Sequence, residues 1–366
     1  MSDRALFSPF EVGPYRLRNR IVMAPMARAR CGPGRAPGPI VGTYYAQRAS
    51  AAFIVTEATH VSADTVSREG TPGIHTQEQT LAWSRVTAAV HEAGGLVFQQ
   101  IYHLGRKQHR SFLPGQQAPI APSAIAACGR VPTASGLQPF SEPRALDTWE
   151  IAGVVDRFRS AAANSMRAGF DGIEIHAANA YLIDQFLRDG TNQREDRYGG
   201  SIENRARLLL EIVDAVGGVV GRDRLGVRLS PHYVVDGIRD SDPQRLFCHV
   251  ARALDEMGIA YLHLVEGRGY GTSVTPAPDA AHLLPHMRQA FWGPLVVNGG
   301  YDRESAEAVL ASGQADMVSF GELFIANPDL PRRFALGAPL NPPDTSSFFT
   351  GSSKGYTDYP ELGACG

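Results

Sequence analysis

The sequence predicts a closed (β/α)8 barrel. Short apolar runs alternate with segments of helical period, and this alternation occurs eight times along the chain. Several of the helical segments end at a glycine, the residue that most often closes a helix: Gly94, Gly169, Gly258 and Gly313. An open doubly wound sheet is the competing fold, but no Gly-x-Gly-x-x-Gly follows the first strand, which ends instead in Pro25. The pattern therefore favours the barrel.

The expected strands are the apolar runs of this alternation. Parallel strands covered by helices are buried on both faces, so they appear in a sequence as short continuous apolar segments. In chain order, we expect strands at residues 20–25, 52–57, 96–102, 172–176, 225–229, 261–265, 295–298 and 317–320. The clearest helices are expected at residues 77–93, 149–168, 204–216, 244–257 and 303–312. Together these units predict a single domain over residues 1–366.

One segment breaks the alternation. Residues 104–146 are rich in Pro, Gly, Ser and Ala and have no clear helical period. A connection of this length is usually functional or disordered, and this one follows the third strand, on the face of a barrel where chemistry collects. We therefore expect a long excursion on the catalytic face.

Composition and charge exclude several classes of partner. The 366 residues include 35 Lys and Arg against 37 Asp and Glu, so the chain lacks the basic character that nucleic acid or anionic lipid requires. The four cysteines are scattered, without metal-ligand spacing or the density of a disulfide framework. No apolar run reaches the length of a signal-peptide core or a membrane span. We expect a cytoplasmic protein, a monomer or a homodimer, that acts on small molecules and binds no metal.

The most informative segment follows the fourth expected strand. His176, Asn179 and Tyr181 lie within six residues, directly after the apolar run 169–175. The imidazole and the carboxamide can donate hydrogen bonds to a carbonyl oxygen, and the phenol can deliver a proton. This set is suited to polarising an activated alkene or carbonyl and then protonating carbon. A lone histidine at a strand end is more often structural, so the interpretation depends on the three side chains occurring together.

Five motifs in this order resemble the Old Yellow Enzyme family of flavin-dependent ene-reductases. Besides the His176 segment, they are Asn19-Arg-Ile-Val-Met-Ala-Pro25-Met, Gln100-Ile-Tyr-His103-Leu-Gly105-Arg106, Tyr198-Gly-Gly-Ser-Ile-Glu-Asn-Arg205 and Phe324-Ile-Ala-Asn-Pro-Asp-Leu330. The resemblance runs nearly end to end. It implies a TIM barrel that binds FMN, takes hydride from NADPH or NADH, and reduces activated C=C bonds. It also implies that the 104–146 excursion covers the mouth of the active site.

The resemblance assigns roles to residues at the expected strand ends. A flavin needs donors at its carbonyl edge and a cation near N1. The cofactor set is Pro25, Met26, Ala27, Ala58, Gln100, Arg228, Gly299, Gly300, Gly321 and Glu322, with the last four at the phosphate. His176 and Asn179 would bind the substrate oxygen, Tyr181 would donate the proton, and Tyr102 and Tyr356 would line the pocket.

Simpler structural explanations stay open for some of these residues. Arg228 could pair with an acid inside the barrel, because a buried guanidinium needs a partner. The glycines could serve only tight turns, and Tyr356 could be a packed C-terminal aromatic residue.

The chain also departs from the family pattern. Glu322 stands where relatives usually carry an arginine that clamps the phosphate, Ala27 where many have Thr, and Ala180 where Gly is usual. Like charges about 4 Å apart repel by roughly 4 kcal/mol at an effective dielectric near 20, so Glu322 must turn away, be compensated by a cation such as Arg303, or weaken FMN binding. These changes leave two other functions open. The first is a flavin-dependent tailoring isomerase or dehydrogenase, and the second is a cofactor-poor binding protein.

Overall fold

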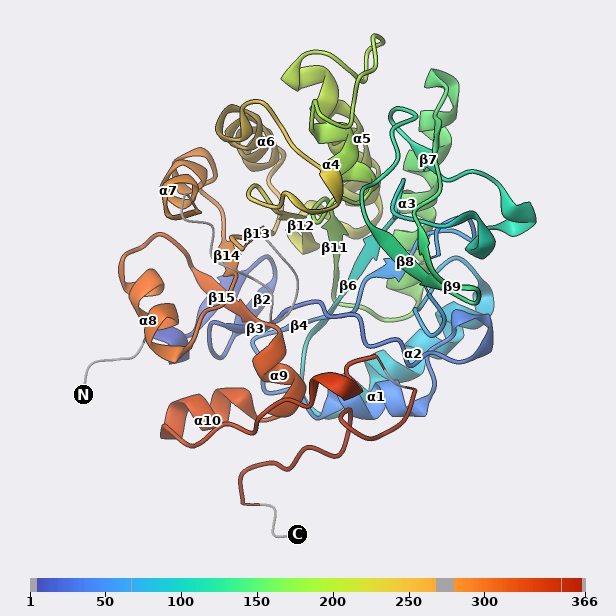
Figure 1. Ribbon diagram of the computed structural model, residues 1–366. Coiled ribbons are helices and arrows are strands. Elements are labelled where there is room, and N and C mark those ends of the chain that lie inside the picture. Colours follow the sequence, from blue (N-terminus) through green and yellow to red (C-terminus); the bar gives the residue numbers. More distant parts are fainter. Residues whose placement is uncertain (1–4, 67, 268–279, 350, 364–366) are drawn as a thin grey trace.

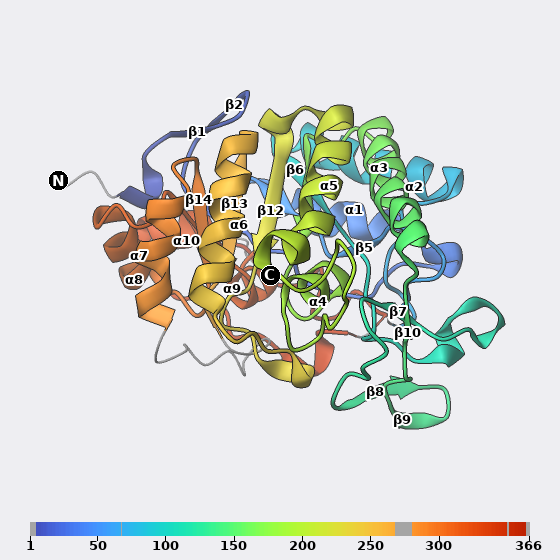
Figure 2. The same ribbon diagram turned by 90° about the horizontal axis from the view of Figure 1, so that it is seen from above.

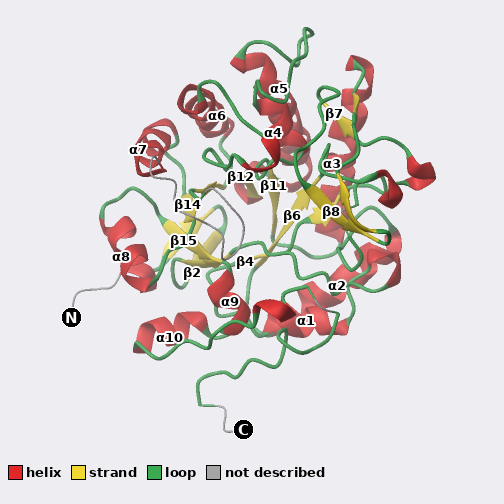
Figure 3. Ribbon diagram, in the orientation of Figure 1, coloured by secondary structure: helices red, strands yellow, loops and turns green. Residues whose placement is uncertain are grey.

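A closed barrel of parallel strands forms the centre of the computed structural model, which describes residues 5–66, 68–267, 280–349 and 351–363 (Figures 1 and 3). Strand β15 pairs with β3, and β11 pairs with both β12 and β6, so the sheet closes on itself. The barrel strands are β3 (Ile21–Met23), β4 (Ile54–Val55), β6 (Val97–Tyr102), β11 (Gly172–His176), β12 (Leu225–Leu229), β13 (Tyr261–Val265), β14 (Leu295–Asn298) and β15 (Met317–Phe320). A short strand, β5 (Thr59–His60), pairs with the end of β6. The predicted barrel is thus confirmed.

The first two barrel strands are shorter than the sequence predicts. The predicted ranges 20–25 and 52–57 become three and two residues. Backbone hydrogen bonds nevertheless continue beyond β4, from Ala52 N to Ile21 O at 2.8 Å and from Thr56 N to Phe98 O at 3.0 Å. The chain therefore stays extended over the predicted range, although only its centre has regular strand pairing.

Helices surround the barrel on its outer side (Figure 3). Their ends follow local signals: Thr76 and Gln79 form a capping box at the start of α2, and Gly258 ends α6 in the left-handed conformation. The helices are α1 (Pro39–Ala46), α2 (Gln77–Glu92), α3 (Ile151–Arg167), α4 (Leu182–Leu187), α5 (Ile202–Val220), α6 (Pro243–Met257), α7 (Ala280–Ala290), α8 (Arg303–Ala311), α9 (Glu322–Ala326) and α10 (Leu330–Leu336). None of the described helices is both long and apolar enough to cross a membrane.

The interior of the barrel changes from apolar to polar along the strands. Near their N-terminal ends, Phe98 and Tyr261 pack edge to face with ring centroids 5.8 Å apart, and a hairpin of β1 (Phe10–Val12) and β2 (Tyr15–Leu17) packs against this cluster. Because side chains alternate along a strand, residues two and four positions further on also face inward. The next interior positions hold Glu174 and His263. The polar end of the barrel is therefore the C-terminal end.

The 104–146 excursion contains short strands. Strands β8 (Arg130–Thr133) and β9 (Gly136–Pro139) form an antiparallel hairpin, while β7 (Ile120–Ala121) pairs in parallel with β10 (Arg144–Ala145). Figure 2 shows the β8–β9 hairpin projecting from the barrel. The excursion contacts the loop after β12 just before β8, where Cys128 N donates to Asp236 O at 3.1 Å.

Candidate active site

His176 ends β11 as a neutral hydrogen-bond donor. Its Nδ1 accepts the backbone N–H of Ala178 at 3.3 Å, which leaves the ring proton on Nε2. Burial, together with the nearby Arg228 and Lys107 cations, holds the pKa of His176 well below its usual range. The imidazole is therefore uncharged at neutral pH and presents one N–H, as binding a carbonyl oxygen requires.

The residues after His176 fold into a strained turn. Asn179 and Ala180 both have positive φ, at 59° and 62°, a region that residues other than glycine rarely adopt. Their backbone N–H groups donate to Ser230 Oγ at 2.7 Å and to Asp184 Oδ2 at 2.9 Å. These bonds hold the turn in place despite the strain, which costs roughly 1–3 kcal/mol per residue. Asn179 thus lies in the same loop as His176 in a fixed backbone conformation.

Aromatic contacts bring Tyr181 and Tyr102 to His176. The Tyr181 ring meets the His176 ring edge to face, with centroids 4.9 Å apart and planes at 88°. It meets the Tyr102 ring in the same way at 5.1 Å. The structure therefore places together the predicted oxygen-binding histidine, the predicted proton donor and one predicted pocket residue.

Arg228 lies next to this cluster, at the end of β12. Its neighbour across the ladder in β11 is His176, and its Nη2 donates to Asn298 Oδ1 at 3.0 Å. Arg228 also helps to lower the pKa of the buried Glu174 carboxyl, so the internal acid that the sequence left open as a partner lies near it, and a role of Arg228 at the flavin stays a prediction.

Gln100 lies one layer deeper in the barrel than the cluster. Its Nε2 donates to Glu174 Oε1 at 2.7 Å, and Glu174 Oε2 contacts His263 Nδ1 at 2.9 Å. The Glu174 carboxylate is fully buried, and His263 lowers its pKa against the effect of burial. Gln100 is therefore held in place from below by a buried acid.

The mouth of the barrel beside β3 and β4 suits a flat apolar ligand with carbonyl groups. Pro25, Met26 and Ala58 are half-buried and Ala27 is exposed, although their neighbours in the chain are largely buried. The N–H of Ala58 makes no hydrogen bond to any described residue, so it can serve a ligand carbonyl. The residues present thus fit the ring of a flavin.

Glycines shape the strand ends that would face a phosphate. Gly299 and Gly300 have φ of 143° and 77°, and a Cβ added at Gly299 would lie 3.1 Å from Gly267 N. A Cβ at Gly321 would lie 3.4 Å from the sulfur of Met26. The positive φ values favour glycine at positions 299 and 300, whereas a Cβ at position 321 would make only an ordinary contact.

Glu322 is the first residue of α9. Burial raises the pKa of its carboxyl, and within the described ranges no basic side chain forms an ion pair with it. The sequence left open that Arg303 compensates the charge of Glu322, but the Arg303 side chain extends toward the end of α10. A Cβ added at Gly337 would lie 3.2 Å from Arg303 Nη1. A half-buried Glu266 also lies near this end of the barrel, after β13, and its Oε2 accepts the hydroxyl of Tyr301 at 2.5 Å.

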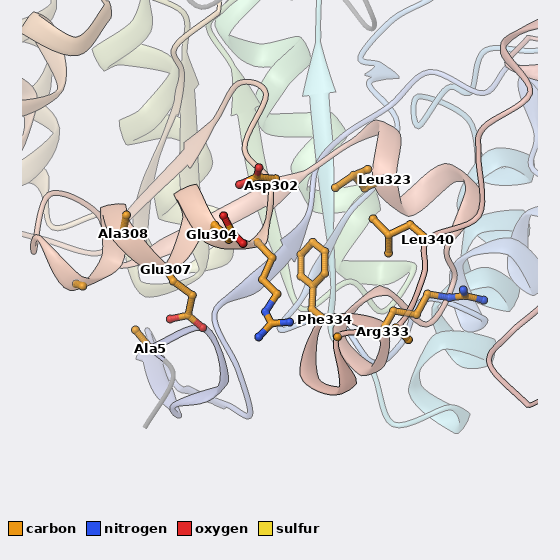
Figure 4. Close-up of a pocket in the computed structure, with 13 residues that line it drawn as sticks. Ala5, Asp302, Glu304, Glu307, Ala308, Leu323, Arg333, Phe334 and Leu340 are labelled. Carbon is orange, nitrogen blue, oxygen red and sulfur yellow. The ribbon is translucent and has the colours of Figure 1, made fainter. Parts of the chain in front are cut away.

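A separate cavity of about 970 Å³ opens between α8, α9 and α10 (Figure 4). Glu307 of α8 and Phe334 of α10 line it, with Leu323 and Leu340. None of His176, Asn179 and Tyr181 lines this cavity. It is therefore distinct from the strand-end cluster.

Tyr356 anchors the C-terminal tail. Its side chain is fully buried and stacks on Tyr44, with centroids 4.1 Å apart and planes at 7°. The guanidinium of Arg30 lies 4.2 Å from the Tyr356 ring centroid, and Arg28 Nη1 donates to Tyr44 Oη at 3.0 Å. This geometry agrees with the packed aromatic residue that the sequence left open, and a substrate contact for Tyr356 stays a prediction.

Three residues of the site were not identified from the sequence. Ser230 and Asp184 fix the turn at Asn179 and Ala180, and Lys107 places its ammonium 5.0 Å from the Tyr181 ring centroid. For Asp184, the spacing of four to Arg188 on a helix is a local signal, and the two side chains do pair at 2.8 Å. Lys107 directly follows a recognised motif, but nothing local indicates its partners.

Comparisons with known proteins agree with this geometry. The family model described as "NADH:flavin oxidoreductase / NADH oxidase family" matches residues 5–341. The chain is 43% identical to 12-oxophytodienoate reductase 2 of Arabidopsis thaliana, over 98% of this chain and 96% of that one. It superposes on a solved morphinone reductase with a TM-score of 0.94 and 46% identity, covering 99% and 98% of the two chains. A structure of an Old Yellow Enzyme homologue from Zymomonas mobilis gives a TM-score of 0.92 at 44% identity, with 98% and 99% covered.

The family match covers most of the chain, and these relatives are similar over nearly their whole length. The barrel is therefore the fold of a known family of flavin enzymes. The chain belongs to the NADH:flavin oxidoreductase / NADH oxidase family, the family of Old Yellow Enzyme, and is an FMN-dependent NAD(P)H oxidoreductase.

Proposed function

We propose that the enzyme reduces the activated C=C bond of α,β-unsaturated carbonyl or nitro compounds through the cluster of His176, Asn179 and Tyr181. The observation that carries the proposal is the contact between a neutral, N–H-donating imidazole and a phenol 4.9 Å away. One group can hold the electron-withdrawing oxygen, and the other can supply the proton.

Each side chain has one task. FMN, when bound, would supply the hydride that the β-carbon of the substrate accepts. His176 donates from Nε2 to the substrate oxygen and withdraws electron density from the double bond. Asn179 adds a second donor from its carboxamide, held by the turn that Ser230 fixes. Tyr181 protonates the α-carbon, which completes the reduction.

The cofactor roles are proposed from the same residues. Pro25, Met26 and Ala27 would cover one part of the flavin ring, Ala58 N–H would serve a ring carbonyl, and Gln100 and Arg228 would bind the pyrimidine edge. Arg228 would supply the cation that favours negative charge near N1. The loops containing Gly299, Gly300 and Gly321 would hold the phosphate through backbone N–H groups, with Glu322 nearby.

Ketones conjugated to an alkene are the substrates that this cluster fits best. A carbonyl oxygen matches two neutral donors, whereas a carboxylate would call for a cation. Two relatives are named for 12-oxophytodienoate and morphinone. Cyclic enones are therefore the first compounds to assay, with NADH and NADPH compared as reductants.

The oxygen-binding role is tested with phenols, whose phenolate oxygen resembles the enone oxygen. The double variant His176→Ala, Asn179→Ala should bind them at least about a hundredfold more weakly, because each of the two lost charge-assisted hydrogen bonds is worth roughly 1.5–3 kcal/mol. Binding is followed by the long-wavelength band of the flavin–phenolate complex. The exposed His286→Ala serves as control. Unchanged affinity in the double variant would remove the pair from this role.

The remaining expectations concern context. We propose that the chain acts as a single domain, as a monomer or a homodimer in the cytoplasm, with no nucleic-acid or membrane partner. The near balance of 35 basic and 37 acidic residues supports the absence of a nucleic-acid or anionic-membrane partner. Light scattering of the purified protein measures its mass in solution, and a tetramer would contradict the proposal.

A further inference from the structure

Lys107 is a buried cation that lies over the ring of the proposed proton donor, Tyr181, and over that of Tyr233. It follows β6, at the start of the excursion, and only 8% of its side chain is exposed. Its Nζ lies 2.5 Å from Asp236 Oδ2, 3.3 Å from the backbone oxygen of Asn179 and 5.0 Å from the centroid of the Tyr181 ring. Burying an ammonium is unfavourable unless it is paired, so the contact with Asp236 explains how the charge is tolerated. It does not explain why the charge lies over Tyr181.

The partner of Lys107 is itself fixed. Asp236 has a φ of 63°, and its backbone oxygen accepts hydrogen bonds from Cys128 N and Arg106 Nη2, both at 3.1 Å. Both donors belong to the excursion after β6, whereas Asp236 lies after β12. The excursion and the β12 loop thus hold the ammonium in one position relative to Tyr181.

We propose that Lys107 is a positioning residue that stabilises the phenolate of Tyr181 formed when Tyr181 gives up its proton. The inference rests on the function proposed above. In that step the O–H bond of Tyr181 breaks and a C–H bond forms at the α-carbon of the substrate. The electron pair stays on the phenolate, which then recovers a proton from water. The negative charge moves from the substrate to a ring that faces the Lys107 ammonium.

Among the described residues, the rings that contact Tyr181 carry no charge, although the Arg228 cation lies near His176. From β11 Tyr181 faces His176, which is neutral, and from β6 it faces the phenol of Tyr102. From the β12 loop, Asp236 carries a negative charge that partly cancels the field of Lys107 at the ring. Lys107 and Asp236 therefore act on the phenolate with opposite signs.

This opposition separates an electrostatic role from a merely structural one. Lys107→Met should slow protonation of the α-carbon about tenfold, and Asp236→Asn should leave it unchanged or make it faster. Lys107→Arg should restore the rate to within about threefold of wild type. If Lys107 served only to hold the excursion, both Lys107→Met and Asp236→Asn would slow the reaction, because each breaks the same ion pair. The double variant Lys107→Met, Asp236→Asn lacks both charges, so it should be slower than wild type but faster than Lys107→Met alone, in which the Asp236 carboxylate still opposes the phenolate.

The FMN-loaded enzyme is assayed with 1-nitrocyclohexene. The nitro group stabilises the carbanion, so addition of hydride and protonation of carbon are observed as separate phases. Only the second phase should respond to Lys107. Its pH profile should shift upward by about one pH unit in Lys107→Met and downward in Asp236→Asn. Slowing of the second phase with an unmoved profile in both variants would overturn the proposal.

A second readout needs no turnover. The ultraviolet tyrosinate titration of wild type minus that of Tyr181→Phe reports the ionisation of Tyr181, and Lys107→Met should move it to higher pH. The Tyr181→Phe background also distinguishes the two proposals. If Tyr181→Phe leaves the second phase unchanged, the proposed function fails. If it slows that phase and Lys107→Met does not, only the role of Lys107 fails.

Discussion

Glu266 should make the protein less stable as the pH rises through neutrality. Burial raises the pKa of its carboxyl to about 7 from an ordinary value of 4.5, although the hydrogen bond from Tyr301 opposes the shift. The folded protein therefore holds a proton that the unfolded chain releases between these two values. Stability contributed by that proton is complete below pH 4.5 and is lost as the pH rises through about 7.

The size of this effect follows from the two pKa values. A tenfold change in proton affinity corresponds to about 1.4 kcal/mol, so the interval from 4.5 to about 7 gives an upper limit of about 3 kcal/mol. Because the side chain is only half-buried, solvent screening should reduce the measured value to about 1–3 kcal/mol.

The variant Glu266→Gln removes the titration and keeps an acceptor for the Tyr301 hydroxyl. It should be more stable than wild type by that amount at pH 8.5 and equal to it, within about 0.5 kcal/mol, at pH 4.5. Urea unfolding at a fixed concentration of added FMN measures the difference, since a ligand bound only to the native state adds its own stabilisation. Tyr301→Phe is the matched control, and it should increase the loss at high pH. A Glu266→Gln effect of the same size at both pH values would refute the reasoning.

Two further predictions concern the phosphate end and the tail. Glu322→Arg should tighten FMN binding about tenfold to a hundredfold, because it replaces a repulsive carboxylate with a bidentate cation. Its affinity for riboflavin, which lacks the phosphate, should not change. If the variant binds FMN no more tightly than wild type, Glu322 points away from the phosphate. Arg30 donates to the backbone oxygens of Ser347 at 2.7 Å and Ser352 at 2.9 Å. Arg30→Met should therefore release the C-terminal tail and make its cleavage by trypsin at least about tenfold faster. The control variant Arg16→Met, at an exposed position, should leave the cleavage rate unchanged.

The sequence was sufficient to predict the barrel because its signals are local. Apolar runs mark buried parallel strands, and glycines such as Gly258 mark helix ends, so strands and helices lie close to the predicted positions. The cluster of His176, Asn179 and Tyr181 was equally accessible, since one short loop after one strand carries all three residues. The strands β3 and β4 were predicted too long because pairing, and not apolar content, limits regular strand structure.

Features that depend on packing between distant segments could not be predicted in this way. Lys107 meets Asp236 only because the excursion after β6 contacts the loop after β12. The burial of Tyr356 depends on Tyr44 and Arg30, more than 300 residues away in the chain. Arg303 could have compensated Glu322 by its position in the sequence, but its side chain extends toward α10.

The central claim is that Tyr181 is the proton donor to carbon, and its most direct test times the two halves of the reaction in Tyr181→Phe. Stopped flow measures reduction of bound FMN by NADH or NADPH separately from its reoxidation by cyclohexenone. Flavin reduction should stay within about twofold of wild type, whereas reoxidation by the enone should slow by about a hundredfold or more, the usual contribution of a general acid. Equal slowing of both steps, or of neither, would contradict the account.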